Sequence, residues 1–324
     1  MSYFAKILVF MMFVIPSCLS FADEAEDRQN NTSTDTQKTV LVTGASSGIG
    51  LRITQVLSEN GYLVYAGARK DADLERLEAM DNVESIRIDV TDQQQIDAAV
   101  KLVTQKGRGL DGLVNNAGIA VIGPLIEVPV AELEWQMNVN VLGPFRVTQA
   151  FAPLIIASKG RITTTGSISG ILSGSMFGHY SMSKHAVEAF SDSLALEMAK
   201  FDVKVSVIEP GNYASKIGEN SMQRMLKKGS WAEDTAYPEE RAGLQARGES
   251  QDKAKDPKEV AEAVMHALFA DNPKHRYMVV PNAGQADYTI RHAMTEMLQL
   301  NHDQAYSLTR DQLVEMLDQQ LKGL

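Results

Sequence analysis

Tyr180 and Lys184 are the two residues of this sequence whose types and spacing best suit proton-transfer chemistry. On a helix, a spacing of four places the phenol and the ammonium on one face, one turn apart. A free phenol has a pKa near 10, and a neighbouring ammonium favours the phenolate and lowers that pKa. The pair therefore predicts an acid-base catalyst, although a Tyr/Lys pair alone is more typical of a solvated helix face.

A glycine-rich turn lies well upstream of this pair. Residues 38–43 form a short β-branched run that predicts a buried strand, and Gly44, Gly48 and Gly50 follow before a helix expected over 51–60. Strand, glycine turn and helix bring the backbone close to a pyrophosphate at the helix N-terminus. The spacing Gly-x-x-x-Gly-x-Gly departs from the usual G-x-G-x-x-G, and a plain tight turn is the alternative.

Three further polar motifs follow strands or interrupt a helix. The segment 115–118 (Asn-Asn-Ala-Gly) comes directly after the apolar strand 110–114. Ser167 follows the strand 160–164 and precedes Tyr180 by thirteen residues, so a loop could carry its hydroxyl beside the phenol. Asn140 interrupts an apolar helix pattern over about 133–157, where an amide normally caps or bends the helix.

In this order, the motifs resemble the short-chain dehydrogenase/reductase family over about residues 38–280. The resemblance implies Tyr180 as proton donor or acceptor and Lys184 as both the pKa-lowering cation and a contact of the nicotinamide ribose. It implies that Ser167 hydrogen-bonds the substrate oxygen and that Asn140 holds a water linking Lys184 to solvent. The finer pattern is similar to the retinol and 17β-hydroxysteroid dehydrogenase branch.

The same resemblance implies a set of cofactor-binding positions. Asp89 and Val90 would contact the adenine, 210–211 would lie against the nicotinamide, and Ser215 would replace a threonine that bonds the carboxamide. The full set is Gly44, Ser46, Ser47, Gly48, Ile49, Gly50, Arg69, Asp89, Val90, Asn116, Ala117, Gly118, Tyr180, Lys184, Pro210, Gly211 and Ser215.

The end of the second expected strand bears on the choice between NADP and NAD. A carboxylate there would bind the ribose 2′-hydroxyl of NAD, but the sequence has Ala68 followed by Arg69 and Lys70. Two cations could neutralise the 2′-phosphate of NADP instead. Asp71 and Asp73 weaken this argument, and ordinary loop charges are the alternative. The sequence predicts NADP in preference to NAD.

Strand and helix patterns alternate along the chain, which predicts an α/β fold with a doubly wound parallel sheet (Rossmann fold) in a single domain. The expected strands are 38–43, 63–65, 84–89, 110–115, 161–165, 203–208 and 276–280. The chain has 324 residues and 44% hydrophobic content, which suffices for one large core. No repeat and no metal-ligand spacing is visible, so we predict no metal.

The N-terminal segment predicts export. Lys6 precedes nine apolar residues at 7–15, and Ser20-Phe21-Ala22 offers a cleavage site before Asp23. We therefore expect a signal peptide or N-terminal membrane segment over 1–22 and a disordered linker over 23–37. Periplasm and endoplasmic reticulum lumen are the expected compartments. Lipid attachment at Cys18 and, because soluble nicotinamide cofactors are chiefly intracellular, a cytoplasmic location are the alternatives.

The dehydrogenase domain is expected over 38–282, with the substrate lid in the least patterned segment, 215–256. Apolar residues lie there among many charges and suggest closure over a lipophilic ligand, or plain packing onto the core: Met222, Met225, Leu226, Trp231 and Tyr237. The tail 283–324 reads as amphipathic helices that cover the pocket, mediate assembly or lie on a membrane.

The sequence therefore predicts an NAD(P)-dependent oxidoreductase that interconverts a lipophilic alcohol and its ketone or aldehyde. The alternatives are a non-catalytic dinucleotide-binding redox regulator and an enzyme that acts on nucleotide sugars. A net charge of −10 argues against nucleic acid as a partner. The expected helices near 133–157 and 180–200 carry more apolar positions than one buried stripe needs, which predicts a homodimer or homotetramer, with complete burial inside one subunit as the alternative.

Overall fold

Seven parallel strands form the sheet at the centre of the fold. The computed structural model describes residues 37–228, 231–248 and 254–323, so the expected signal peptide and nearly all of the expected linker lie outside the described residues. The sheet order is β3-β2-β1-β4-β5-β6-β7. The strands are β1 Thr39–Val42, β2 Leu63–Ala68, β3 Val83–Arg87, β4 Gly112–Asn115, β5 Arg161–Thr165, β6 Lys204–Pro210 and β7 Arg276–Val279. This confirms the predicted doubly wound α/β fold.

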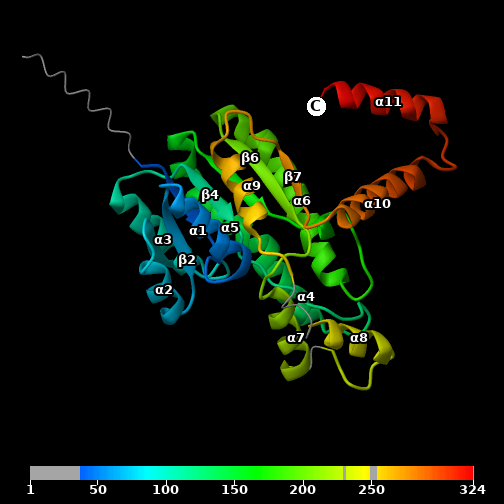
Figure 1. Ribbon diagram of the computed structural model, residues 1–324, viewed down its shortest axis with the longest axis horizontal. Helices are drawn as coiled ribbons and strands as arrows, with labels where there is room; N and C mark the ends of the chain where they lie inside the picture. Colours follow the sequence, from blue (N-terminus) through cyan, green and yellow to red (C-terminus); the bar gives the residue numbers. More distant parts are fainter. Residues whose placement is uncertain (1–36, 229–230, 249–253, 324) are drawn as a thin grey trace, which may run out of the picture. The chain divides into compact units, whose positions relative to one another are not determined.

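Helices connect the strands and continue beyond the last of them (Figure 1). They are α1 Gly48–Glu59, α2 Asp71–Glu78, α3 Gln93–Lys106, α4 Val130–Met137, α5 Gly143–Ser158, α6 Gly178–Met198, α7 Ile217–Lys228, α8 Pro238–Gly248, α9 Lys258–Phe269, α10 Ala283–Asn301 and α11 Arg310–Lys322. Short turns add η1 Asn138–Leu142, η2 Ile168–Gly170 and η3 Ala199–Phe201. Helices α7 and α8 fall within the segment expected to be the lid.

Alternate side chains of each strand enter two different cores, one on each face of the sheet. Val40 and Val42 point to the face covered by α1 and α9, which lie side by side in Figure 1. Leu41 points to the opposite face, where α3, α5 and the end of α6 pack. Both faces of the sheet are therefore covered by helices, as is usual for a parallel sheet. The functional residues are then expected in the loops at the carboxyl edge of the sheet.

The helical run from Val130 to Ser158 is apolar enough by length and composition to cross a membrane. Its residues Val147, Phe151 and Ile155 are fully buried in the core against the sheet, so it is a core helix of this fold. The run is broken by the π-helical turn η1, which contains Asn140. Such turns are frequent at functional sites.

Candidate active site

A cavity of about 810 Å³ opens at the carboxyl edge of the sheet. The strand order reverses between β1 and β4, and in open α/β sheets a ligand crevice forms at this point. The described residues that line the cavity include every cofactor-binding position expected from the sequence, together with Ser167. Asn140 is the one expected site residue that does not line it.

The glycine turn after β1 forms one wall of the cavity. Gly44 has a φ of +66°, and a Cβ there would lie 2.8 Å from the Cα of Ala117. Gly48 also has a positive φ, +55°. Ser47 occupies the N-cap position of α1 but makes no side-chain cap bond, so it leaves the first N–H groups of the helix to other acceptors. A close backbone and free N–H donors fit a pyrophosphate.

Asn116 and Thr43 join the ends of three strands beneath this turn. The Asn116 side-chain amide donates to the carbonyl oxygens of Thr43 (3.1 Å) and Gly44 (3.3 Å) and accepts from the Thr165 hydroxyl (3.3 Å). The Thr43 hydroxyl accepts from the backbone N–H groups of Asn116 and Ala117. The segment after β4 therefore fixes the shape of the cradle that the glycines line.

Arg69 and Asp89 lie together at the other end of the cavity. Arg69 is 64% exposed at its side chain, and its guanidinium lies 3.4 Å from the Asp89 carboxylate. Burial alone would raise the pKa of Asp89, but hydrogen bonds from Thr91 and the charge of Arg69 lower it below its ordinary value. An exposed cation therefore directly follows β2, at the position where a carboxylate would bind a ribose 2′-hydroxyl.

Arg76 is a second cation at this end that sequence reasoning missed. It projects from α2 and donates to the carbonyl oxygen of Ser46 at 2.5 Å and to Asp73 at 3.1 Å. Ser46 itself lines the cavity. The only signal in the sequence was one more arginine on a charged helix, which gave no reason to place it over the glycine turn.

Tyr180 and Ser167 face each other across the middle of the cavity. Burial raises the pKa of the Tyr180 phenol to about 12, while its hydrogen bond with Ser167 acts in the opposite direction. The expectation of a lowered phenol pKa is therefore wrong for the protein by itself. The Nζ atom of Lys184 lies 5.6 Å from the centre of the Tyr180 ring.

Lys184 is almost fully buried, with 6% of its surface exposed. Its ammonium donates to the carbonyl oxygen of Thr165 at 2.7 Å. Burial lowers the pKa of Lys184 to about 8, and the carboxylate of Glu188, one turn further along α6, opposes this effect. The cation next to the phenol is thus close to its own titration at neutral pH.

Asn140 lies behind the cavity in a buried amide network. Its side chain accepts from the Ile119 N–H (2.9 Å) and donates to the Ile119 carbonyl (2.9 Å) and to Ser183 (3.0 Å). Gln136, which sequence reasoning missed, repeats this pattern with Val121, Ile119 and Ser183. Both amide hydrogens of Asn140 are used inside the protein, so its side chain positions the loop after β4, and its part in a water relay stays a prediction.

The segment after β6 closes the cavity on the side of Pro210 and Gly211. The Gly211 N–H donates to the Val279 carbonyl at 2.8 Å, which ties this segment to β7. The next N–H, that of Asn212, donates to the side chain of Gln285 on α10 at 3.0 Å. Helix α10 therefore reaches the rim of the cavity. This contact is required if the tail covers the pocket, which is one of the three expectations for it.

The remaining wall of the cavity is apolar and comes from segments far apart in the chain. It includes Ile119, Ala120, Ile122, Leu172, Phe177, Ile217, Met222, Leu244 and Tyr288. Of the apolar residues expected in the lid, Met222 lines this wall, whereas Met225 and Trp231 are fully buried in a cluster with Ile122. The expected lid is thus built partly from packing residues and partly from residues that can touch a ligand.

Residues 38–226 match the family model for short chain dehydrogenases. The chain belongs to this family. It is 37% identical over 253 residues to the NADPH-dependent 3-dehydrocapnine reductase of Ornithobacterium rhinotracheale, an alignment that covers 74% of this chain and 87% of the relative. It is 33% identical over 265 residues to retinol dehydrogenase 5 of Mus musculus, covering 78% and 82%. The resemblance found in the sequence is thereby confirmed.

The fold comparison agrees. The solved structure of a short-chain dehydrogenase from Streptomyces avermitilis is 31% identical to this chain, with a TM-score of 0.70, and the alignment covers 82% of this chain and 95% of that one. The chain is an NAD(P)-dependent dehydrogenase acting on CH–OH groups, as the sequence predicted.

Proposed function

We propose that this dehydrogenase interconverts a lipophilic alcohol and its ketone or aldehyde, with Tyr180 as the acid-base catalyst and NADP as the preferred cofactor. The observation that carries this proposal is the meeting of Tyr180, Ser167 and Lys184 between a polar half and an apolar half of one cavity. No feature of the described residues favours the rival reading as a non-catalytic regulator.

The proposed chemistry assigns one task to each side chain. A bound nicotinamide supplies the hydride for reduction and accepts it for oxidation. In reduction, the Tyr180 hydroxyl gives its proton to the substrate oxygen, and in oxidation the phenolate takes the proton of the alcohol. The Ser167 hydroxyl donates to the same oxygen and holds it beside the phenol. Lys184 stabilises the phenolate that the proton transfer leaves behind.

The charges of the cavity support a neutral substrate. Among the described lining residues, the charged ones are Arg69, Asp89, Lys184 and Lys216. Arg69 and Asp89 lie at the nucleotide end, Lys184 bonds Thr165, and Lys216 lies beside the glycine turn. The apolar wall offers no cation that could pair with an anionic substrate. A neutral apolar substrate would instead pack against this wall and shield its surface from water.

The preference for NADP rests on Arg69 and Arg76. Arg69 lies at the end of β2 within the cavity, and Arg76 reaches the backbone of the glycine turn at Ser46. Two guanidinium groups there would bind a 2′-phosphate by charge-assisted hydrogen bonds. The related 3-dehydrocapnine reductase is described as NADPH-dependent, which supports the same choice.

Export and self-assembly belong to the proposal as well. The apolar run 7–15 behind Lys6 supports export or membrane attachment of the enzyme, with cleavage after Ala22 as the favoured outcome. Leu142, Phe145 and Met182 expose about half of their surface on the helices expected to pair two subunits. This exposure supports a homodimer or homotetramer.

Replacement of the phenol tests the proposal. In Tyr180→Phe, kcat should fall about 100- to 10,000-fold, because proton transfer by a positioned side chain contributes that much. The dissociation constant for NADP should stay within about twofold. Tyr62→Phe, whose ring stacks on Phe269 away from the cavity, is the matched control and should keep wild-type turnover. A Tyr180→Phe enzyme with near-normal kcat would remove the basis of the assignment.

A further inference from the structure

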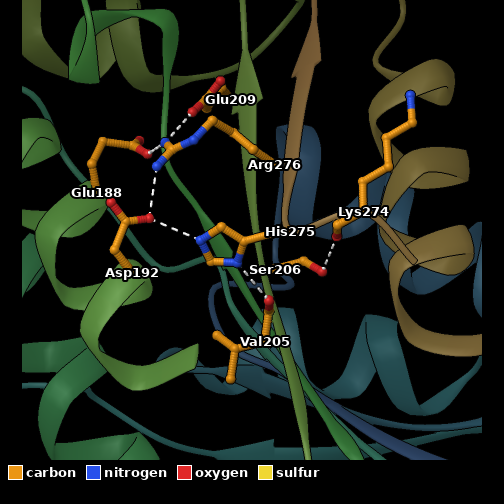
Figure 2. Close-up of polar contacts among 8 residues, drawn as sticks. All are labelled: Glu188, Asp192, Val205, Ser206, Glu209, Lys274, His275 and Arg276. Atoms are coloured by element: carbon orange, nitrogen blue, oxygen red, sulfur yellow. Dashed lines mark hydrogen bonds and ion pairs between the residues drawn. The ribbon is translucent and has the colours of Figure 1, made fainter. Parts of the chain in front are cut away.

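A charged cluster joins α6, β6 and β7 (Figure 2). Glu188 on α6 is 8% exposed and Glu209 on β6 is 1% exposed. Arg276 on β7 lies between them: its Nη1 donates to Glu209 at 2.6 Å and also to Glu188, and its Nη2 donates to Asp192 at 2.7 Å. One arginine thus serves two buried carboxylates and a third near the surface.

This cluster touches each of the three segments that carry the proposed active site. Glu188 lies one turn after Lys184 on the same helix. A Cβ on Gly166 or on Gly170 would lie 2.6 Å from Glu188 Oε1, so the loop that carries Ser167 rests directly on this carboxyl group. Glu209 immediately precedes Pro210, at the start of the segment expected against the nicotinamide.

Burying these charged groups costs free energy of folding, which a purely structural element would not require. Two carboxyl groups share one guanidinium in the interior, and Glu188 Oε1 is buried without a hydrogen-bond partner. Apolar side chains of similar size often stabilise a fold as well as a buried ion pair does, or better. The nearby ammonium of Lys184 is the group that gains from a carboxylate at this place.

We propose that Glu188 is a positioning residue of the reaction: its carboxylate maintains the positive charge of Lys184 and seats the loop of Ser167, while Arg276, which Glu209 also binds, holds it in place. This inference rests on the proposed function, because Lys184 and Ser167 act on the substrate only through that mechanism. Figure 2 shows Arg276 reaching all three carboxylates from β7.

The electrostatics of the neighbours agree with this geometry. Burial lowers the pKa of Lys184 to about 8, and Glu188 is the charge that opposes the decrease. The charged groups that face Glu188 are Lys184 on its own helix, Glu209 on β6 and Arg276 on β7. Burial and the charge of Glu209 raise the pKa of Glu188 to about 8 against the opposing effect of Arg276, so the carboxyl group is ionised on the alkaline limb, where Lys184 also titrates.

The test is the pH profile of ketone or aldehyde reduction by Glu188→Gln. Without the carboxylate, Lys184 loses its proton at a lower pH, so the alkaline limb of kcat/KM moves to lower pH. A shift of one unit reduces kcat/KM on that limb about tenfold. Asp192→Asn, on the same helix and bound to the same arginine, is the matched control and should keep the wild-type limb.

Two more variants separate charge from folding. The Glu209→Gln variant removes the repulsion on Glu188, so the alkaline limb of this variant should stay in place or move to higher pH. A move to lower pH would contradict the proposal, and this result can be obtained even if Glu188→Gln does not fold. Glu188→Asp keeps the charge and should restore the limb with a reduced kcat. If folded Glu188→Gln keeps the wild-type alkaline limb, the inference about Glu188 is wrong but the proposed function stands. If Tyr180→Phe keeps its activity, the proposed function itself is wrong.

Discussion

The two halves of the cavity are built in different ways. At the nucleotide end, backbone groups and short motifs fix the shape: Gly44 approaches Ala117, and Asn116 bonds the strand ends on either side. At the substrate end, the wall consists of apolar side chains from α7, α8, α10 and the loops after β4 and β5. Hydrogen bonds define the first half, and long-range packing defines the second, so a mutation should affect one half without the other.

Trp231→Ala should give the largest effect, at the substrate end. Trp231 is 1% exposed in the cluster with Ile122 and Met225, and its indole N–H donates to Thr235 at 2.8 Å. Removal of a buried tryptophan costs about 3–5 kcal/mol, here from the packing of the lid. KM for an apolar substrate should rise at least about tenfold while the dissociation constant for NADP stays within about twofold.

Leu226→Ala is the matched control for this prediction. Leu226 lies on α7 beside Met225 but is 45% exposed, so its removal opens no cavity in the cluster. Steady-state kinetics and limited proteolysis of the 215–256 segment should distinguish the two variants. Equal loss of NADP binding and substrate binding in Trp231→Ala would show that the two halves of the cavity are not independent.

Arg69→Ala should produce the converse effect, at the nucleotide end. A charge-assisted hydrogen bond to a 2′-phosphate contributes about 1.5–3 kcal/mol, so the dissociation constant for NADP should rise about 10- to 100-fold. NAD has no phosphate at that position, and its affinity should not change. Lys70, the other cation that the sequence offered for the phosphate, does not line the cavity, so Lys70→Ala removes the same charge from the neighbouring position and serves as control. Fluorescence titration with both nucleotides checks this, and an equal loss for NAD and NADP would rule out phosphate recognition by Arg69.

The positions of the motifs at the proposed nucleotide end could be predicted from the sequence because their determinants are local. The strand expected over 161–165 coincides with β5, and the glycine turn and the segment 115–118 take up the expected positions in the cavity. Such motifs need only a strand and a following turn, and both are visible within about ten residues. The parallel sheet then brings the motifs to one edge without any information about side-chain packing.

The substrate end and the buried charges could not be predicted in the same way. Glu188 and Arg276 are 88 residues apart, and each looks like an ordinary charge of an α/β domain. Gln136 follows Glu132 and Glu134 on α4 and looks like one more polar residue of that helix, and only the path of the loop after β4 reveals its partners. The direction of the pKa change of Tyr180 also depends on burial, which the spacing of Tyr180 and Lys184 does not contain.

Lys184 lies where the two halves meet, and its burial should reduce the stability of the fold. Its pKa of about 8 in the folded protein lies below the value of about 10.5 expected for an unfolded chain. Between these values the unfolded state binds more protons, so the stability of the wild type rises with pH across this window. Below about pH 8, the buried charge costs about 3 kcal/mol, and the hydrogen bond to Thr165 returns about 1 kcal/mol.

Lys184→Met should therefore abolish turnover and yet raise the free energy of unfolding by about 2 kcal/mol at pH 7. The gain should be roughly halved at pH 9, because by then the wild type has begun to release the proton of Lys184 on folding. Urea unfolding of both proteins at the two pH values measures the difference. Lys200→Met, an exposed lysine in η3, is the control and should change stability by less than about 0.5 kcal/mol. A less stable Lys184→Met protein at pH 7 would show that the ammonium supports the fold at the junction instead of being held there for function.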